Sequence, residues 1–280
     1  MEAYTDFAEL YDVFMDNVPY DAWVARVKEL LAARGIRDGL VLDLCCGTGQ
    51  VTRRLAAAGY DMIGVDASDR MLDVASGYQA LEDAGTGQAA GDSPADRAQA
   101  AASGDILYLC QQMQSFELYG TVRAVVCMCD SLNYLTEDGE LEQTFRLVNN
   151  YLDPEGVFVF DMNTPWKYEA LLGDNVFAEN RPEGSFIWEN EYDPETSLNT
   201  YDLTLYARGE GGLYSRSEEF HVERAYGLSQ ILEALERAGL VLERVYADYD
   251  GDALALPAPQ DGEGLERWVF VAREKGKKRA

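Results

Sequence analysis

The residues best suited to chemistry in this sequence lie in one short stretch, residues 41–49 (VLDLCCGTG). An apolar run ends in the acid Asp43, and the chain then turns through Gly47-x-Gly49. A second apolar run ends in another acid, Asp66. Glycines let a backbone approach a ligand closely, and an acid at the end of the second strand can accept the hydroxyl groups of a ribose. The pattern therefore predicts a Rossmann-like site for an adenosine-bearing cofactor.

The glycine pair also allows a different reading of this site. The dinucleotide fingerprint Gly-x-Gly-x-x-Gly requires a third glycine three residues after Gly49, where this chain has Thr52. A nicotinamide-dependent oxidoreductase therefore remains an alternative, although the dinucleotide motif is incomplete in this sequence. The acid ahead of the glycine pair and Asp66 at the end of the second strand strengthen the prediction of an adenosine-bearing cofactor.

Charge and hydropathy exclude several partners. Asp and Glu number 50 against 23 Lys and Arg, which gives a net charge of −27. Such a field repels phosphate backbones, so we expect no nucleic-acid substrate. No apolar run approaches the roughly 18 residues that a membrane helix needs, so we expect no membrane partner. The N-terminus is acidic, unlike that of a signal peptide. We expect a cytoplasmic protein that acts as a monomer or homodimer.

The cysteines and the histidine argue against a metal site. All five cysteines lie in or beside apolar runs, and an odd number of such thiols is typical of a reducing compartment. The sequence has no Cys-x-x-Cys, and His221 is its only histidine, so no metal is predicted. A lone histidine is more often structural than catalytic. The five cysteines are Cys45, Cys46, Cys110, Cys127 and Cys129.

The elements that must position these residues alternate between strands and helices. Helical spacing at residues 141–152 and 228–238 is typical of helices that pack on a sheet. The sequence therefore predicts an α/β, Rossmann-like fold with a mostly parallel sheet and helices on both faces. Apolar runs predict its strands at residues 41–44, 62–65, 106–110, 124–129 and 157–160, with 241–248 and 268–273 as an antiparallel pair at the sheet edge.

Two regions interrupt this pattern. Residues 84–104 are rich in alanine and glycine, contain no large apolar residue, and predict a flexible surface loop or a weak helix. The pattern breaks at about residue 165, and residues 186–192, 199–207 and 214–225 then alternate polar with apolar or aromatic side chains, as antiparallel strands with one wet face do. We therefore expect residues 1–164 and 226–275 to form the cofactor-binding domain, with 165–225 inserted as a β lid or substrate subdomain.

Three motifs together resemble one family. They are LDLCCGTG at residues 42–49, Asp66 after the second strand, and a helix that starts Phe-Ala-x-x-Tyr-Asp at residues 7–12. The chain is similar to class I S-adenosylmethionine-dependent methyltransferases, and more narrowly to small bacterial members. The resemblance covers residues 4–163 and, more loosely, 227–273. It implies methyl transfer from S-adenosylmethionine to nitrogen or oxygen of an unidentified small molecule, with S-adenosylhomocysteine as the product.

The resemblance also implies which residues bind the cofactor. Gly47 and Gly49 would line the turn against it, Asp43 would orient the methionine ammonium, and Asp66 would accept both ribose hydroxyls. Tyr11 and Tyr20 would contact the cofactor from helices folded over it, and Ala67, Met71 and Met113 would pack against adenine. Gln112 would accept a hydrogen bond from the adenine amino group, at a position where many relatives have an acid. Cys129 would contact the cofactor through its backbone.

The acceptor side of the site is less defined. Ligands of open α/β sheets bind at the carboxyl ends of strands, so the segment after residues 124–129 faces cofactor and substrate. Tyr134 and Asp130 are the catalytic candidates there, with Asn133 beside them, and a loop or helix-capping role is the alternative for each. Transfer from a sulfonium needs no dedicated base when the acceptor is a neutral amine or an ionised oxygen. A non-catalytic protein that binds S-adenosylmethionine is therefore a further alternative.

Overall fold

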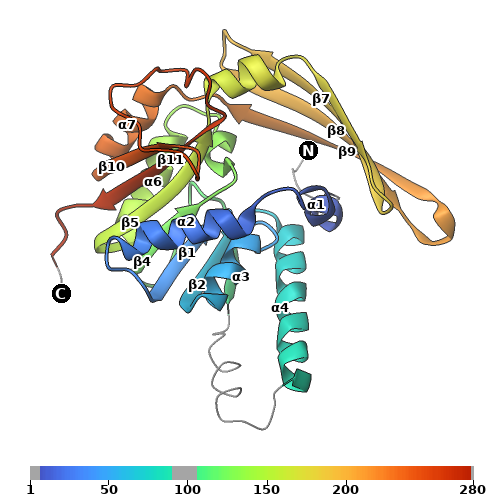
Figure 1. Cartoon of the computed structure of the whole chain (residues 1–280), viewed down its shortest axis with the longest axis horizontal. Helices are drawn as coiled ribbons and strands as arrows, with labels where there is room; N and C mark the ends of the chain where they lie inside the picture. Colours follow the sequence, from blue (N-terminus) through green and yellow to red (C-terminus); the bar gives the residue numbers. More distant parts are fainter. Residues whose placement is uncertain (1–6, 90–105, 279–280) are drawn as a thin grey trace.

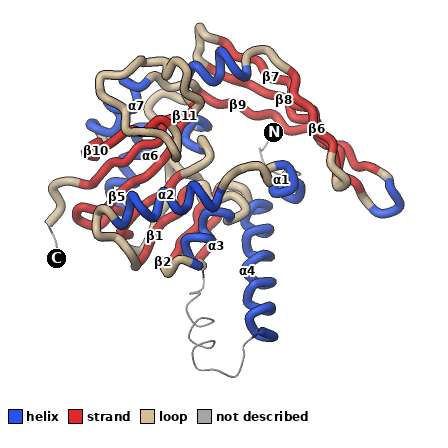
Figure 2. The backbone as a smooth tube through the Cα atoms, in the orientation of Figure 1, coloured by secondary structure: helices blue, strands red, loops and turns tan. Residues whose placement is uncertain are grey.

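The computed structural model describes residues 7–89 and 106–278 and contains two sheets (Figures 1 and 2). The larger has seven strands in the order β3-β2-β1-β4-β5-β11-β10. All neighbours pair in parallel except β11, which lies antiparallel between β5 and β10. This confirms the predicted fold class and the antiparallel pair at the sheet edge. The strands are β1 (Gly39–Leu44), β2 (Tyr60–Asp66), β3 (Leu107–Cys110), β4 (Val122–Cys127), β5 (Leu152–Asn163), β10 (Leu240–Ala247) and β11 (Arg267–Glu274).

Helices cover both faces of this sheet. Val41 packs in the core under α2 (Tyr20–Ala32) and α3 (Gln50–Ala57). The next residue, Leu42, packs in the core under α6 (Glu140–Tyr151) and α7 (Leu228–Arg237). Successive strand side chains point to opposite faces, so a strand covered on both sides reads as one apolar run. Among the described residues, no helix is long and apolar enough to cross a membrane.

Several predicted boundaries were wrong. Strand β4 ends at Cys127, because the backbone turns into the left-handed region at Cys129, where φ is 61°. Strand β5 begins at Leu152, directly after α6, and so is longer than predicted. Helix α4 (Asp69–Ala89) continues into the alanine-rich region, so residues 84–89 adopt the helix that was one of the two alternatives expected there. The rest of that region lies outside the described residues.

The lid forms the second sheet, which projects from the body of the protein (Figure 1). Its strands are antiparallel in the order β6-β7-β8-β9, and a π-helical turn, η2 (Lys167–Leu172), precedes them. The short strand β6 was not predicted, because its five residues carry too little pattern. Helix α1 (Ala8–Phe14) reaches the lid through an edge-on contact of Phe14 with Phe186. The lid strands are β6 (Val176–Asn180), β7 (Gly184–Asp193), β8 (Leu198–Arg208) and β9 (Tyr214–Arg224).

One buried asparagine holds both ends of the lid. Asn133 lies in the short helix η1 (Ser131–Tyr134) and is fully buried. Its amide nitrogen donates to the carbonyl oxygen of Arg224, at 2.8 Å, where β9 ends. Its amide oxygen accepts from the backbone N–H of Asn163, at 3.0 Å, where β5 ends. The chain therefore leaves and re-enters the main domain at the same point.

Replacing this side chain tests the arrangement. Asn133→Ala removes the side-chain partner of two backbone groups, one buried and one partly buried, and a buried group left unsatisfied costs about 1–3 kcal/mol. We expect the free energy of unfolding, measured by urea denaturation, to fall by about 2–4 kcal/mol. The control is Asn150→Ala on the exposed face of α6, which should change it by less than about 0.5 kcal/mol. Equal effects of the two substitutions would contradict the role of Asn133.

Candidate active site

A cavity lies at the carboxyl ends of the central strands. Strand β1 pairs with β2 on one side and β4 on the other, so the order of strands along the chain reverses here. Ligands of open α/β sheets bind outside such a switch point. The cavity has a volume of about 380 Å³, and its walls come from α1, α2, the turn after β1, the end of β2, the segment after β3, and η1.

The turn after β1 needs left-handed backbone at three positions. Cys45, Gly47 and Gly49 have φ values of 64°, 53° and 76°. A Cβ on Gly49 would lie 2.6 Å from the hydroxyl oxygen of Tyr108, so a side chain there would displace this ring, and the positive φ also favours glycine. Gly47 lines the cavity, whereas Gly49 is not among the lining residues. The second glycine therefore acts here by allowing the turn and the packing of Tyr108.

Asp66 ends β2 and faces the cavity with both oxygens engaged. Oδ2 accepts from the backbone N–H of Gly47 at 2.8 Å, and Oδ1 accepts from that of Ser68 at 2.9 Å. Burial raises the pKa of this carboxyl, and the two N–H groups oppose the rise. A carboxylate has about four acceptor positions, so both oxygens can still accept hydroxyl groups of a ligand.

Asp43 lies beneath the turn and is only 2% exposed. Its Oδ2 accepts from the hydroxyl of Thr52 at 2.6 Å. Burial raises the pKa of Asp43 to about 7; the hydrogen bond from Thr52 opposes the rise and the charge of Asp66 adds to it. Thr52 stands where a dinucleotide fingerprint requires glycine, and its buried hydroxyl serves the acid instead.

Two tyrosines form the wall opposite the turn. Tyr11 from α1 and Tyr20 from α2 both line the cavity. The Tyr20 hydroxyl hydrogen-bonds to the side chains of Tyr11 and Cys129, and burial raises its pKa. Helix α1 is tied to the turn by the hydroxyl of Thr48, which donates to Asp12 at 2.8 Å. Sequence reasoning missed this last contact, which gives the first helix a fixed place over the cavity.

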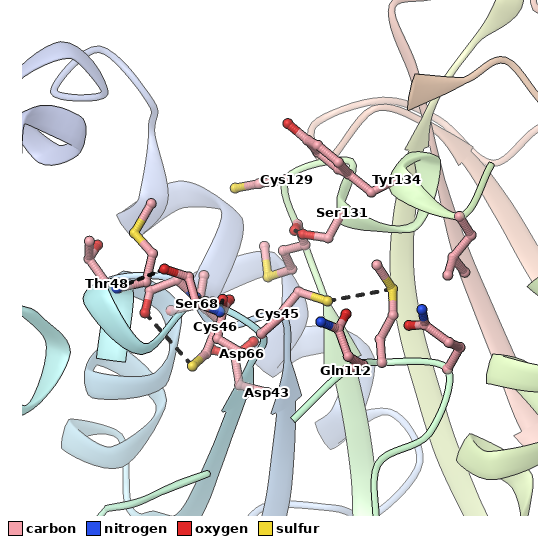
Figure 3. Close-up of a pocket in the computed structure, with 18 of the residues that line it drawn as sticks. Asp43, Cys45, Cys46, Thr48, Asp66, Ser68, Gln112, Cys129, Ser131 and Tyr134 are labelled. Carbon is pink, nitrogen blue, oxygen red and sulfur yellow. Dashed lines mark hydrogen bonds between the residues drawn. The ribbon is translucent and has the colours of Figure 1, made fainter. Parts of the chain in front are cut away.

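The remaining wall follows β2 and β3. Ala67, Met71, Gln112 and Met113 all line the cavity there. The Met113 sulfur lies 3.6 Å from the thiol of Cys45, which joins this wall to the turn (Figure 3). Gln112 is exposed, so its amide is open to a ligand. The structure therefore brings every predicted cofactor-binding residue except Gly49 to one cavity.

The two catalytic candidates have different surroundings. Tyr134 lines the cavity, and Figure 3 shows its hydroxyl directed away from Asp43 and Asp66. Asp130 is not among the lining residues. Its carboxylate accepts from the amide of Asn163 at 2.9 Å and lies 3.4 Å from the guanidinium of Arg267. This structural pairing places Asp130 behind the cavity wall.

Sequence reasoning missed the buried charges behind this wall. Arg267 pairs with Asp161, and Asp161 in turn accepts from the backbone N–H of Asp130 at 2.9 Å. These residues are far apart in the chain, and no local motif relates them. A signal did exist in β9, where Glu219, His221 and Glu223 alternate with apolar residues, but the alternation does not say which set faces inward.

Comparison with known proteins gives consistent matches. A Geobacillus sp. (strain WCH70) protein named as a methyltransferase is 32% identical over 97% of this chain and 99% of its own length. A Streptomyces venezuelae protein, named dTDP-3-amino-3,4,6-trideoxy-α-D-glucopyranose N,N-dimethyltransferase, is 28% identical over 60% of this chain and 61% of its own. The crystal structure of an S-adenosylmethionine-dependent methyltransferase from Clostridium acetobutylicum is 25% identical, with a TM-score of 0.79 over 98% of this chain and 100% of that one.

A family model described as a methyltransferase domain matches residues 20–245, which include the turn after β1, both acids and the whole lid. With the relatives above, this match shows that the chain belongs to the methyltransferase-domain family of S-adenosylmethionine-dependent enzymes.

Proposed function

We propose that this enzyme binds S-adenosylmethionine in the cavity described above and methylates a nitrogen or oxygen atom of a small molecule. The observation that carries the proposal is the meeting of Asp66, Gly47 and Asp43 with Tyr134 around one cavity. The cavity brings together two acids, which suit a ribose and an ammonium group, and a polar side chain, which suits a methyl acceptor.

The side chains that line the cavity match the parts of the cofactor one by one. Asp66 has acceptor positions for the two ribose hydroxyls, and Asp43 would face the ammonium of the methionine part. Ala67, Met71 and Met113 offer apolar surface to adenine, with Gln112 as an acceptor at its edge. The bound cofactor supplies an activated methyl group on a sulfonium. The protein's part is to align the acceptor and to exclude water.

A small acceptor is supported by the site and by one relative. The net charge of −27 disfavours a nucleic acid. The name of the Streptomyces venezuelae relative specifies an amino group on a sugar nucleotide, which supports a nitrogen acceptor. Turnover tests the proposal. We expect release of S-adenosylhomocysteine with at least one of four probes, 2-phenylethylamine, 2-phenylethanol, glucosamine and glucose. Binding of the cofactor without turnover on any small acceptor would favour a non-catalytic role.

The role of Asp66 can be tested by calorimetry with S-adenosylmethionine. Asp66→Ala should weaken binding by about 100-fold or more, because two hydrogen bonds to a charged group are each worth about 1.5–3 kcal/mol. Asp61→Ala, an exposed acid on the same strand, is the matched control and should leave the affinity unchanged. NAD should not bind. Unchanged affinity in Asp66→Ala would place the cofactor elsewhere.

The pKa of Asp43 predicts how binding depends on pH. Since that pKa is raised to about 7, the carboxyl is mostly neutral at pH 6 and mostly ionised at pH 8. An ammonium group binds the ionised form better, so the dissociation constant should fall by about 3- to 10-fold from pH 6 to pH 7.5, with the α-amino group still largely cationic. Asp43→Asn should abolish this dependence. A pH-independent wild type would mean that Asp43 does not face the ammonium.

A further inference from the structure

Helix α3 begins without a capping side chain of its own. The residue before it is Gly49, so the first N–H groups of the helix need an acceptor from elsewhere. Asp43 supplies one, because its carboxylate accepts from both the backbone N–H and the hydroxyl of Thr52, the third residue of the helix. Thr52 is 0% exposed, and its hydroxyl oxygen lies 2.6 Å from Oδ2 of Asp43. The acid of β1 and the threonine of α3 therefore form one buried unit.

No ion pair joins Asp43 to a cationic side chain in the part of the chain that the structure describes. The titratable groups that face it come from the end of β2, the turn after β1 and the end of β4, and none is a cation: Asp66, Cys46, Cys127 and Cys129. A buried charge costs free energy unless a partner of opposite sign compensates it. Because Asp43 also lines the cavity, a cationic ligand can supply that partner.

Before a ligand binds, α3 stabilises the ionised form of this acid. The N-terminal end of a helix carries partial positive charge, and Asp43 accepts hydrogen bonds from the first turn of α3. Burial, the largest effect, and the charge of Asp66 raise the pKa of Asp43, the two hydrogen bonds from Thr52 lower it, and the resulting pKa is about 7. At neutral pH a single hydrogen bond therefore decides how much of this carboxyl is ionised.

Thr52 acts on the cavity only through this acid. It is not among the residues that line the cavity, whereas Asp43 is. A carboxylate has about four acceptor positions, so the two hydrogen bonds from Thr52 leave others for a ligand. A dinucleotide fingerprint has glycine at the position of Thr52, for close packing of the helix on the strand. Here a hydrogen bond joins α3 to β1 instead, and it fixes the orientation of the carboxylate toward the cavity.

We propose that Thr52 is a positioning residue that holds the carboxylate of Asp43 ready for the ammonium group of the cofactor's methionine part, without touching the cofactor itself. The proposal rests on the cofactor site proposed above and names the group that makes its buried acid able to bind a cation. Removing the Thr52 hydroxyl should weaken the contact with the ammonium. The contacts of Asp66 and of the apolar wall with the adenosine part should stay as they are.

The direction of the change with pH follows from the lost hydrogen bond. Without the hydroxyl, burial and the charge of Asp66 still raise the pKa of Asp43 and one opposing hydrogen bond is gone, so this pKa rises above about 7. A carboxyl is ionised only above its pKa, so the pH range over which the affinity increases should move upward by about one unit. At pH 7 the ionised fraction would fall from about one half to about one tenth, which is about a fivefold loss of affinity.

Calorimetry with two ligands separates this role from a structural one. S-adenosylmethionine carries the ammonium, whereas methylthioadenosine has the adenosine part and lacks the amino-acid part. Thr52→Val keeps the shape of the side chain and the backbone N–H, and removes only the hydroxyl. At pH 7 it should weaken binding of S-adenosylmethionine about fivefold or more and change binding of methylthioadenosine less than about twofold. Thr52→Ser restores a hydroxyl and should bind both ligands within about twofold of the wild type.

Thr144→Val is the matched control. Thr144 lies in α6 and is also 0% exposed, but its hydroxyl makes no hydrogen bond with any described residue, so both affinities should stay unchanged. Equal losses of affinity for the two ligands in Thr52→Val would mean that the hydroxyl only supports the fold, and would overturn the proposal. An unchanged affinity for S-adenosylmethionine would overturn it too. Wild-type protein that does not bind S-adenosylmethionine would instead overturn the proposed function, and this role with it.

A titration without any ligand measures the same hydrogen bond. Carbon-13 NMR of aspartate-labelled protein follows the carboxyl groups one by one, and the signal of Asp43 is the one that Asp43→Asn removes. We expect a pKa of about 7 in the wild type, a pKa about one unit higher in Thr52→Val, and the wild-type pKa in Thr52→Ser. A pKa of Asp43 that stays the same in Thr52→Val would overturn the role of Thr52 even if the enzyme binds its cofactor.

Discussion

Two walls of the cavity, the one that includes the turn after β4 and the one that includes α2, depend for their position on the buried ion pair between Arg267 and Asp161. Arg267 begins β11, Asp161 lies in β5, and Asp161 also accepts from the backbone of Asp130 in the turn after β4. The guanidinium lies over the ring of Trp23, 4.8 Å from its centroid, and so reaches α2. Removing one partner of a buried pair leaves an uncompensated charge and costs about 3–5 kcal/mol. The pair therefore joins the antiparallel strand β11 to β5 and to the turn after β4.

The site divides into two halves, one built from residues of neighbouring segments and one from residues far apart in the chain. The cofactor half is local, because Asp43, Gly47 and Asp66 come from adjacent parallel strands and the turn between sheet and helix. The acceptor half is assembled over long distances. Tyr134 comes from η1, whereas Tyr201 and His221 face each other across β8 and β9. Under the proposed function the first half would hold the cofactor and the second the methyl acceptor, so a local motif would serve one ligand and contacts with the lid the other.

This division explains what could be predicted from the sequence. The strand ends with their acids, the parallel sheet and the antiparallel lid follow from local periodicity and from glycines in a turn. The inward face of β9 does not, because a shift of one residue in an alternating strand exchanges its faces, and the alternation alone does not say which set is buried. The contact of Gly49 with Tyr108 and the pairing of Arg267 with Asp161 join distant segments. Nothing in either segment alone encodes such contacts.

The two hydrogen bonds by which Asn133 holds both ends of the lid have a consequence for how such an enzyme diversifies. The lid leaves the main domain after β5 and returns before α7 at a single side chain, so its two ends are already close together in space. Insertions, deletions or wholesale exchange of the segment between them need not alter the register of any strand in the seven-stranded sheet. The lid can thus change as a module, while the seven-stranded sheet and the turn after β1 stay as they are.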